Sequence, residues 1–171
     1  MSTILVDHFR MMFKSAHSWF EGTVDGVDSD LAHWAPPGIL TPIASFYAHA
    51  VLAEDFMVDG YALGKQPTMM QGGSGISEPP PGDNKWRDWG LRVKVDLPVT
   101  RAFAQRVYSA TDSYLAALTD ADLQKPLDLA VVGGGMGTVA IMLNVVGTHF
   151  YSHSGEISAI KGLKSMKGYP M

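Results

Sequence analysis

Two histidines four residues apart, inside a long segment with helical periodicity, constrain this chain more than any other feature. Residues 138–163 place apolar side chains at helical spacing, and His149 and His153 fall in the middle of that stripe. Each helical residue turns about 100°, so the two imidazoles lie one above the other on the face that must be buried. Imidazoles so placed can bind one metal ion, and a third ligand must then come from elsewhere in the chain.

Three further segments have helical periodicity: residues 3–24, about 41–60 and about 86–118. Thr41-Pro42 is a good start for the second helix, with Thr as N-cap and Pro at the first helical position. In the third, Leu97-Pro98 leaves open either a kink or a start near Asp96 with Pro98 in the first turn. Four long amphipathic helices predict an all-α fold, a four-helix bundle.

The connections between these helices are rich in breakers. Residues 25–41 contain Asp28-Ser29-Asp30-Leu31, which predicts a short turn or a single helical turn. Residues 61–85 are dense in Gly and Pro and have no periodicity, so a lid, a partner-contacting arm and a disordered excursion all stay open. Residues 127–132 are apolar and β-branched and are expected to be extended, until Gly133-Gly134-Gly135 ends them.

Length and composition narrow the class of protein. The 171 residues predict one domain spanning 1–171. The absence of cysteine excludes disulfides, thiolate metal sites and a cysteine nucleophile, and it favours a cytoplasmic protein. A net charge of -4 provides no basic surface for nucleic acid. No signal peptide or membrane span is expected, because Asp7, His8 and Arg10 interrupt the N-terminal apolar residues.

Several familiar catalytic motifs are absent. Phe150 follows His149, so the general base of the His-Glu-x-x-His motif is missing. The chain has four glutamates, and none has a histidine three residues later, as a di-iron bundle would need. The glycine-rich run at residues 133–138 lacks the third glycine of the dinucleotide fingerprint.

A three-histidine site remains. His49 lies in the second predicted helix on the same face as Phe46, Ala53 and Phe56, so it points where the apolar residues point. Three neutral imidazoles with an open fourth position are typical of catalytic metal sites, whereas the alternative is histidines that only form hydrogen bonds in the core.

The other candidate site residues are weaker. His8 is a reserve ligand, because it can face the core beside Leu5 and Met12. His17 and His33 are expected at the surface or in a loop. Glu156 lies one turn past His153 on the same face, where it can orient a ligand, act as a base, or simply be a partly exposed carboxylate.

The order and spacing of three motifs make the chain resemble the DinB/YfiT-like superfamily over nearly its whole length. These motifs are Trp34-Ala35-Pro36-Pro37-Gly38, Phe46-Tyr47-Ala48-His49 and His149-x-x-x-His153-x-Gly155-Glu156-Ile157. The resemblance implies up-down-down-up connectivity, a divalent metal, often nickel or zinc, on the three matching histidines, and a homodimer. Relatives include S-transferases that use mycothiol or bacillithiol, and a mycothiol-dependent isomerase in a related branch. Residues 61–85 depart from the family's usual pattern, so the resemblance does not extend to the substrate pocket.

Three functions are consistent with these observations. The first is a metal-dependent S-transferase that activates a thiol cofactor against a small electrophile, since the chain has no thiol of its own. The second is a metal-dependent hydrolase. The third is a non-enzymatic, metal-stabilised bundle that binds a small molecule or a partner protein, for which 10 methionines would suit an adaptable surface. With histidine pKa values near 6.5, metal release is expected below about pH 6.

Overall fold

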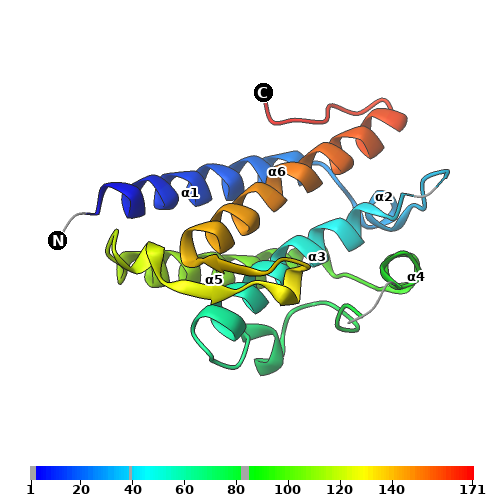
Figure 1. Cartoon of the computed structure of the whole chain (residues 1–171). Helices are drawn as coiled ribbons and strands as arrows, with labels where there is room; N and C mark the ends of the chain where they lie inside the picture. Colours follow the sequence, from blue (N-terminus) through cyan, green and yellow to red (C-terminus); the bar gives the residue numbers. More distant parts are fainter. Residues whose placement is uncertain (1–2, 39, 82–84) are drawn as a thin grey trace.

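Four long helices form the body of the molecule in a computed structural model that describes residues 3–38, 40–81 and 85–171. They are α1 (Ile4–Val24), α3 (Ile43–Asp55), α5 (Leu97–Ala116) and α6 (Val139–Leu163). α1 and α6 run in one direction, and α3 and α5 run in the other (Figure 1). The predicted all-α, up-down-down-up bundle is therefore confirmed.

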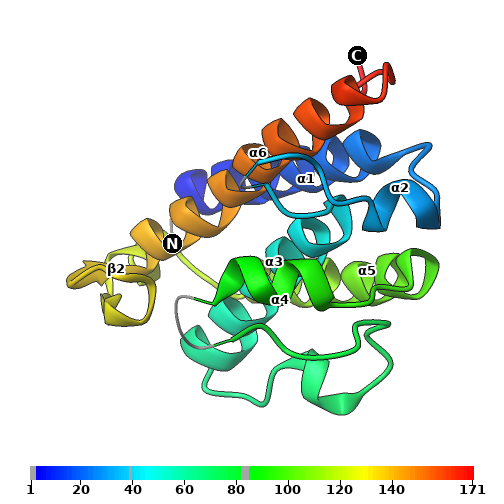
Figure 2. The ribbon, with the colours of Figure 1, turned by 90° about the vertical axis from the view of Figure 1, so that its right-hand side faces the viewer.

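The bundle is closed by large side chains from all four helices. α6 packs on α1 and α3, and α5 packs on the same two helices (Figure 2). Phe20, Tyr47, Phe103 and Phe150 come from α1, α3, α5 and α6 in turn, and each is completely buried. The apolar stripes read from the sequence thus meet in one core.

Short elements join the long helices. They are α2 (Ser29–His33), a π-helical turn (Phe56–Ala62), a 3-10 turn (Thr68–Gln71), α4 (Trp86–Arg92), a 3-10 turn (Asp122–Gln124), β1 (Pro126–Asp128), a 3-10 turn (Ala130–Val132) and β2 (Met136–Thr138). β1 and β2 pair antiparallel, with Leu127 opposite Gly137. The predicted extended segment over residues 127–132 is right only as far as Asp128, because the chain then coils into a tight turn.

The helix predicted over residues 86–118 is two helices. α4 ends at Arg92, and Val95 pairs in an extended bridge with Ile76 before α5 begins at Leu97. The Asp96 side chain accepts a hydrogen bond from the Val99 N–H, and Pro98 lies in the first turn. Of the two alternatives left open for Leu97-Pro98, the helix start is correct, because the cap and the proline favour an N-terminus over a kink.

The start and end of α3 also differ from expectation. Pro42 occupies the N-cap position, so the predicted cap by Thr41 is wrong. The Thr41 hydroxyl instead accepts a hydrogen bond from Ser45 Oγ, 2.8 Å away. The α-helix ends at Asp55 rather than near Gly60, and the chain continues as the π-helical turn. Such turns widen the helix and are frequent at functional sites.

Residues 61–81, the described part of the predicted Gly/Pro-rich loop, pack against the bundle. The Asp55 carboxylate accepts hydrogen bonds from the backbone N–H groups of Thr68 and Met69, both at 2.8 Å. Farther along, the Ser77 N–H donates to the Lys94 carbonyl at 2.9 Å. Residues 61–81, the excursion, run beneath α4 and α5 in Figure 2. Residues 82–84 of the predicted loop lie outside the described residues.

Over the described residues, no helix combines the length and the apolar character needed to cross a membrane.

Gly90 should test how closely α4 is packed on α3. A Cβ at Gly90 would lie 2.8 Å from Thr41 Cγ2 and 3.0 Å from Ser45 Oγ, whereas one at Gly162 in α6 would meet nothing within 4 Å. Gly162→Ala should stabilise by about 0.5–1 kcal/mol through helix propensity. Gly90→Ala should destabilise by about 1–3 kcal/mol, because overpacking outweighs that gain. Urea unfolding of both variants measures the difference, and equal stabilisation would contradict the close packing of α4.

Candidate metal centre

Three histidines from two helices converge at the candidate site. His49 lies on α3, and His149 and His153 lie one turn apart on α6. The Nε2 atom of His149 lies 3.1 Å from that of His49 and 2.8 Å from that of His153. Nitrogens about 2.0–2.1 Å from a tetrahedral zinc are about 3.3 Å apart, so the spacing is close to that of a ligand set. The three residues predicted to lie together do so; that they bind a metal stays a prediction.

Burial keeps two of these imidazoles neutral. Desolvation, with a smaller contribution from the neighbouring histidines, lowers the pKa of His49 to about 3. Desolvation first, and then the proximity of His153, lowers the pKa of His149 to about 4. Neutral rings keep the lone pairs that a metal needs. Both pKa values lie below the ordinary histidine value of about 6.5 on which the expected metal release below about pH 6 was based, and that release stays a prediction.

Glu156 orients one of the three rings. Its carboxylate oxygen Oε2 accepts a hydrogen bond from Nδ1 of His153, which leaves Nε2 of that ring directed at His149. Carboxylates that hold the far nitrogen of a histidine in this way are typical of metal sites, where they fix the tautomer and raise the basicity of the ligand. The position of Glu156 thus matches the orienting role more closely than that of a free base; a catalytic role stays a prediction.

A cavity of about 310 Å³ opens beside the three histidines. Besides His49, His153 and Glu156, its wall is made by Leu40, Thr41, Ser45, Phe46, Trp86, Arg87 and Trp89. The Trp86 ring meets the His49 ring edge to face at 4.4 Å, and the Phe46 ring lies 5.4 Å from that of His153. Two helices therefore supply the candidate metal ligands, while α4 supplies three residues of the cavity wall, Trp86, Arg87 and Trp89.

The reserve ligand is not at the site. His8 is exposed at the outer end of α1, because the helix presents Val6 and Phe13 to the core instead. His33 lies in α2, where Nδ1 donates to the Ser29 carbonyl and Nε2 accepts from the Val95 N–H.

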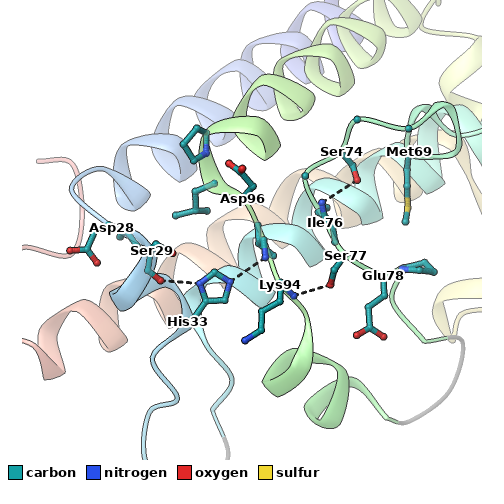
Figure 3. Close-up of a pocket in the computed structure, with 18 of the residues that line it drawn as sticks. Asp28, Ser29, His33, Met69, Ser74, Ile76, Ser77, Glu78, Lys94 and Asp96 are labelled. Carbon is teal, nitrogen blue, oxygen red and sulfur yellow. Dashed lines mark hydrogen bonds between the residues drawn. The ribbon is translucent and has the colours of Figure 1, made fainter.

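A larger hollow, of about 1220 Å³, surrounds His33 rather than the three histidines (Figure 3). Its charged and polar side chains already hold the fold together. Asp28 caps α2 and Asp96 caps α5, and Ser77 Oγ accepts from the Lys94 N–H at 2.9 Å. The dashed contacts in Figure 3 join α2, the excursion and the segment before α5. This hollow thus marks where the excursion is attached to the bundle.

The prediction that His17 lies at the surface or in a loop is wrong. Its Nε2 lies 2.8 Å from Oε2 of Glu54, a carboxylate that is 0% exposed, and its ring stacks on Tyr108 at 3.7 Å. The second oxygen of Glu54 is buried and has no hydrogen-bond partner. The sequence offered a weak signal for this pair, since a glutamate stood on the apolar side of the second helix beside Val51 and Met57. Which residue pairs with Glu54 depends on how α1 and α3 face each other across the core of the bundle.

Two comparisons with known proteins give matches to this chain, and a third gives none. The sequence model of a family described as the DinB superfamily matches residues 12–157. A crystal structure of a conserved protein from Enterococcus faecalis superposes with a TM-score of 0.76. That match covers 94% of this chain and 96% of the other at 16% sequence identity, so it supports the fold alone. No curated protein matches the chain.

Acid should destabilise the metal-free protein through the buried histidines. Below pH 6.5 an unfolded histidine takes up a proton, whereas His49 in the folded protein stays neutral until about pH 3. The unfolded state then binds more protons, so stability should fall as the pH decreases from about 6.5 towards 4. Melting temperatures in chelator between pH 7.5 and pH 5 measure this slope. His49→Gln should flatten it, and His8→Gln should not; an unchanged slope in His49→Gln would show that His49 is not the cause.

Removing His17 should cost more than removing the whole pair. His17→Leu leaves the buried Glu54 carboxyl group without the hydrogen-bond partner of its Oε2, at a cost of about 1–3 kcal/mol. His17→Leu combined with Glu54→Leu removes both polar groups and should recover most of that loss. Urea unfolding of the single and double variants tests this coupling. Strictly additive losses would mean that the two side chains do not act as a pair.

Proposed function

This chain belongs to the DinB superfamily, and from that premise we propose that it is a divalent-metal-dependent enzyme acting on a small electrophile. His49, His149 and His153 would hold a zinc or nickel ion through their Nε2 atoms. The observation that carries the proposal is the convergence of three Nε2 atoms, two of them from histidines (His49 and His153) that line a cavity. A closed structural site would use four protein ligands, whereas three leave one position for a reactant.

Thiol transfer is the reaction that we propose for this site. A bound divalent ion would lower the pKa of a thiol at its open position, and so supply a nucleophile at neutral pH. The thiol must come from a cofactor, because the chain contains no cysteine. A low-molecular-weight thiol of the mycothiol or bacillithiol type would fill this role.

The chain's own residues would prepare the site for that chemistry. Glu156 holds the Nδ1 proton of His153 and so keeps the lone pair of Nε2 available. Phe46 and Trp86 shield the histidines from water on the cavity side, which strengthens electrostatic interactions within it. The low pKa values of His49 and His149 keep both rings unprotonated at neutral pH.

His149→Ala should abolish metal binding and leave a folded helical protein. The untagged protein, prepared without a nickel column, should contain about one divalent ion per chain. The variant should contain almost none, and its circular dichroism should be unchanged because the large apolar core does not depend on the ion. Glu156→Gln should weaken metal affinity by about 10–100-fold. His8→Ala is the matched control, since His8 is exposed and away from the site.

Turnover should then follow the same variants. Consumption of 1-chloro-2,4-dinitrobenzene should require both the metal and an added thiol, and His149→Ala should lack it. Full metal occupancy in His149→Ala would reject the ligand set. Turnover of an ester with metal but no thiol would indicate a hydrolase, and metal binding without turnover across a broad panel would indicate a binding protein.

A further inference from the structure

The cavity beside the histidines carries an arginine with no acidic partner. Arg10, Arg92 and Arg101 each form an ion pair with a carboxylate. Arg87 lines the cavity, and across the described ranges no acidic side chain pairs with it. Its Nη2 donates to the Gly38 carbonyl at 3.1 Å, which uses one of the five N–H donors of the guanidinium. The remaining donors can receive an anion, and two parallel bonds to a carboxylate are the preferred arrangement.

Apart from Leu40 and Arg87, the cavity wall consists of aromatic side chains and of polar side chains that already have hydrogen-bond partners. Trp86 and Phe46 come from different helices and flank different histidines, so their rings border the same space beside the candidate metal position. Ser45 Oγ contacts Thr41 Oγ1 and the Pro42 carbonyl, and Glu156 is held by His153. Arg87 is thus the charged group of the wall whose donors are still available to a ligand.

From this combination we propose that the cavity binds a small aromatic carboxylate, with its ring against Trp86 and Phe46 and its carboxylate on Arg87. The volume of about 310 Å³ is at the lower end of ligand pockets, which favours a single-ring molecule over a peptide or a large cofactor. Aromatic rings gain about 0.5–1.5 kcal/mol from edge or offset contacts beyond the area that they bury. The role of this ligand as a substrate rests on the proposed function, whereas its binding to the cavity does not.

Three probes of nearly equal size separate the contributions of ring and charge. Benzoate has both features, benzamide has the ring without the charge, and cyclohexanecarboxylate has the charge without the flat ring. Dissociation constants come from tryptophan fluorescence and ligand-observed NMR, on protein with zinc and on protein treated with chelator. Benzoate should bind about tenfold more tightly than benzamide, and several-fold more tightly than cyclohexanecarboxylate, in both preparations.

Arg87→Gln should remove the preference for benzoate over benzamide and leave benzamide binding unchanged. Arg92→Gln is the matched control, because Arg92 lies on the same helix, pairs with Glu78 and does not line the cavity. Trp86→Leu should weaken benzoate and benzamide alike.

Two results would overturn the proposal. One is benzoate binding no more tightly than benzamide; the other is a preference that survives Arg87→Gln, as it would if the carboxylate bound the zinc instead. Measurements on the chelator-treated protein separate failure of the ligand proposal from failure of the metalloenzyme proposal. A protein that binds no metal would still show the Arg87-dependent preference, whereas a metal-binding protein without it would refute only the ligand class.

Discussion

The half-buried carboxylate of Glu21 joins three of the four long helices. Tyr47 of α3 and Tyr108 of α5 both donate hydroxyl hydrogen bonds to its Oε1, at 2.7 and 2.9 Å. Arg101 of α5 lies 3.0 Å from its other oxygen. Hydrogen bonds and an ion pair of this kind stabilise a carboxylate that is partly removed from water. The cluster therefore sets how α1, α3 and α5 lie along one another, and the position of His49 on α3 depends on it.

The fourth long helix, α6, is attached to the end of α1 by Lys161, a buried lysine near the C-terminus of α6. Nζ of Lys161 donates to the carbonyls of Thr23 and Asp25, both at 2.8 Å, where α1 ends and its carbonyls lack helical partners. This contact fixes how far α6 extends along α1. Because His149 and His153 lie upstream on the same rigid helix, it also helps to bring them level with His49. Ion pairs and hydrogen bonds remote from the site thus hold the Nε2 atoms of the three histidines close enough together to bind one metal ion.

The segment between α3 and α5, residues 56–96, supplies part of the cavity wall but none of the three histidines. The excursion after α3 is held by Asp55 and by its bridge to Val95, and the chain then returns through α4 across the start of α3. Gly90 permits the close approach to Thr41, and that approach places Trp86 and Arg87 beside the histidines.

The sequence by itself determined what depends on neighbours along the chain. The helical stripes, the stacking of His149 over His153 and the reach of Glu156 all follow from spacings of three or four residues, which a helix converts directly into geometry. The apolar face of the second predicted helix indicated that His49 would join them, and the resemblance of short motifs supported that expectation.

Only the tertiary structure decided which distant residues meet. The pairing of His17 with Glu54, the Glu21 cluster and the aromatic wall with Arg87 all depend on how far one helix slides along another. A slide of one turn, about 5.4 Å, leaves every local pattern intact and yet separates each of these contacts. Local periodicity cannot specify that offset, because it is set by the packing of all four helices at once.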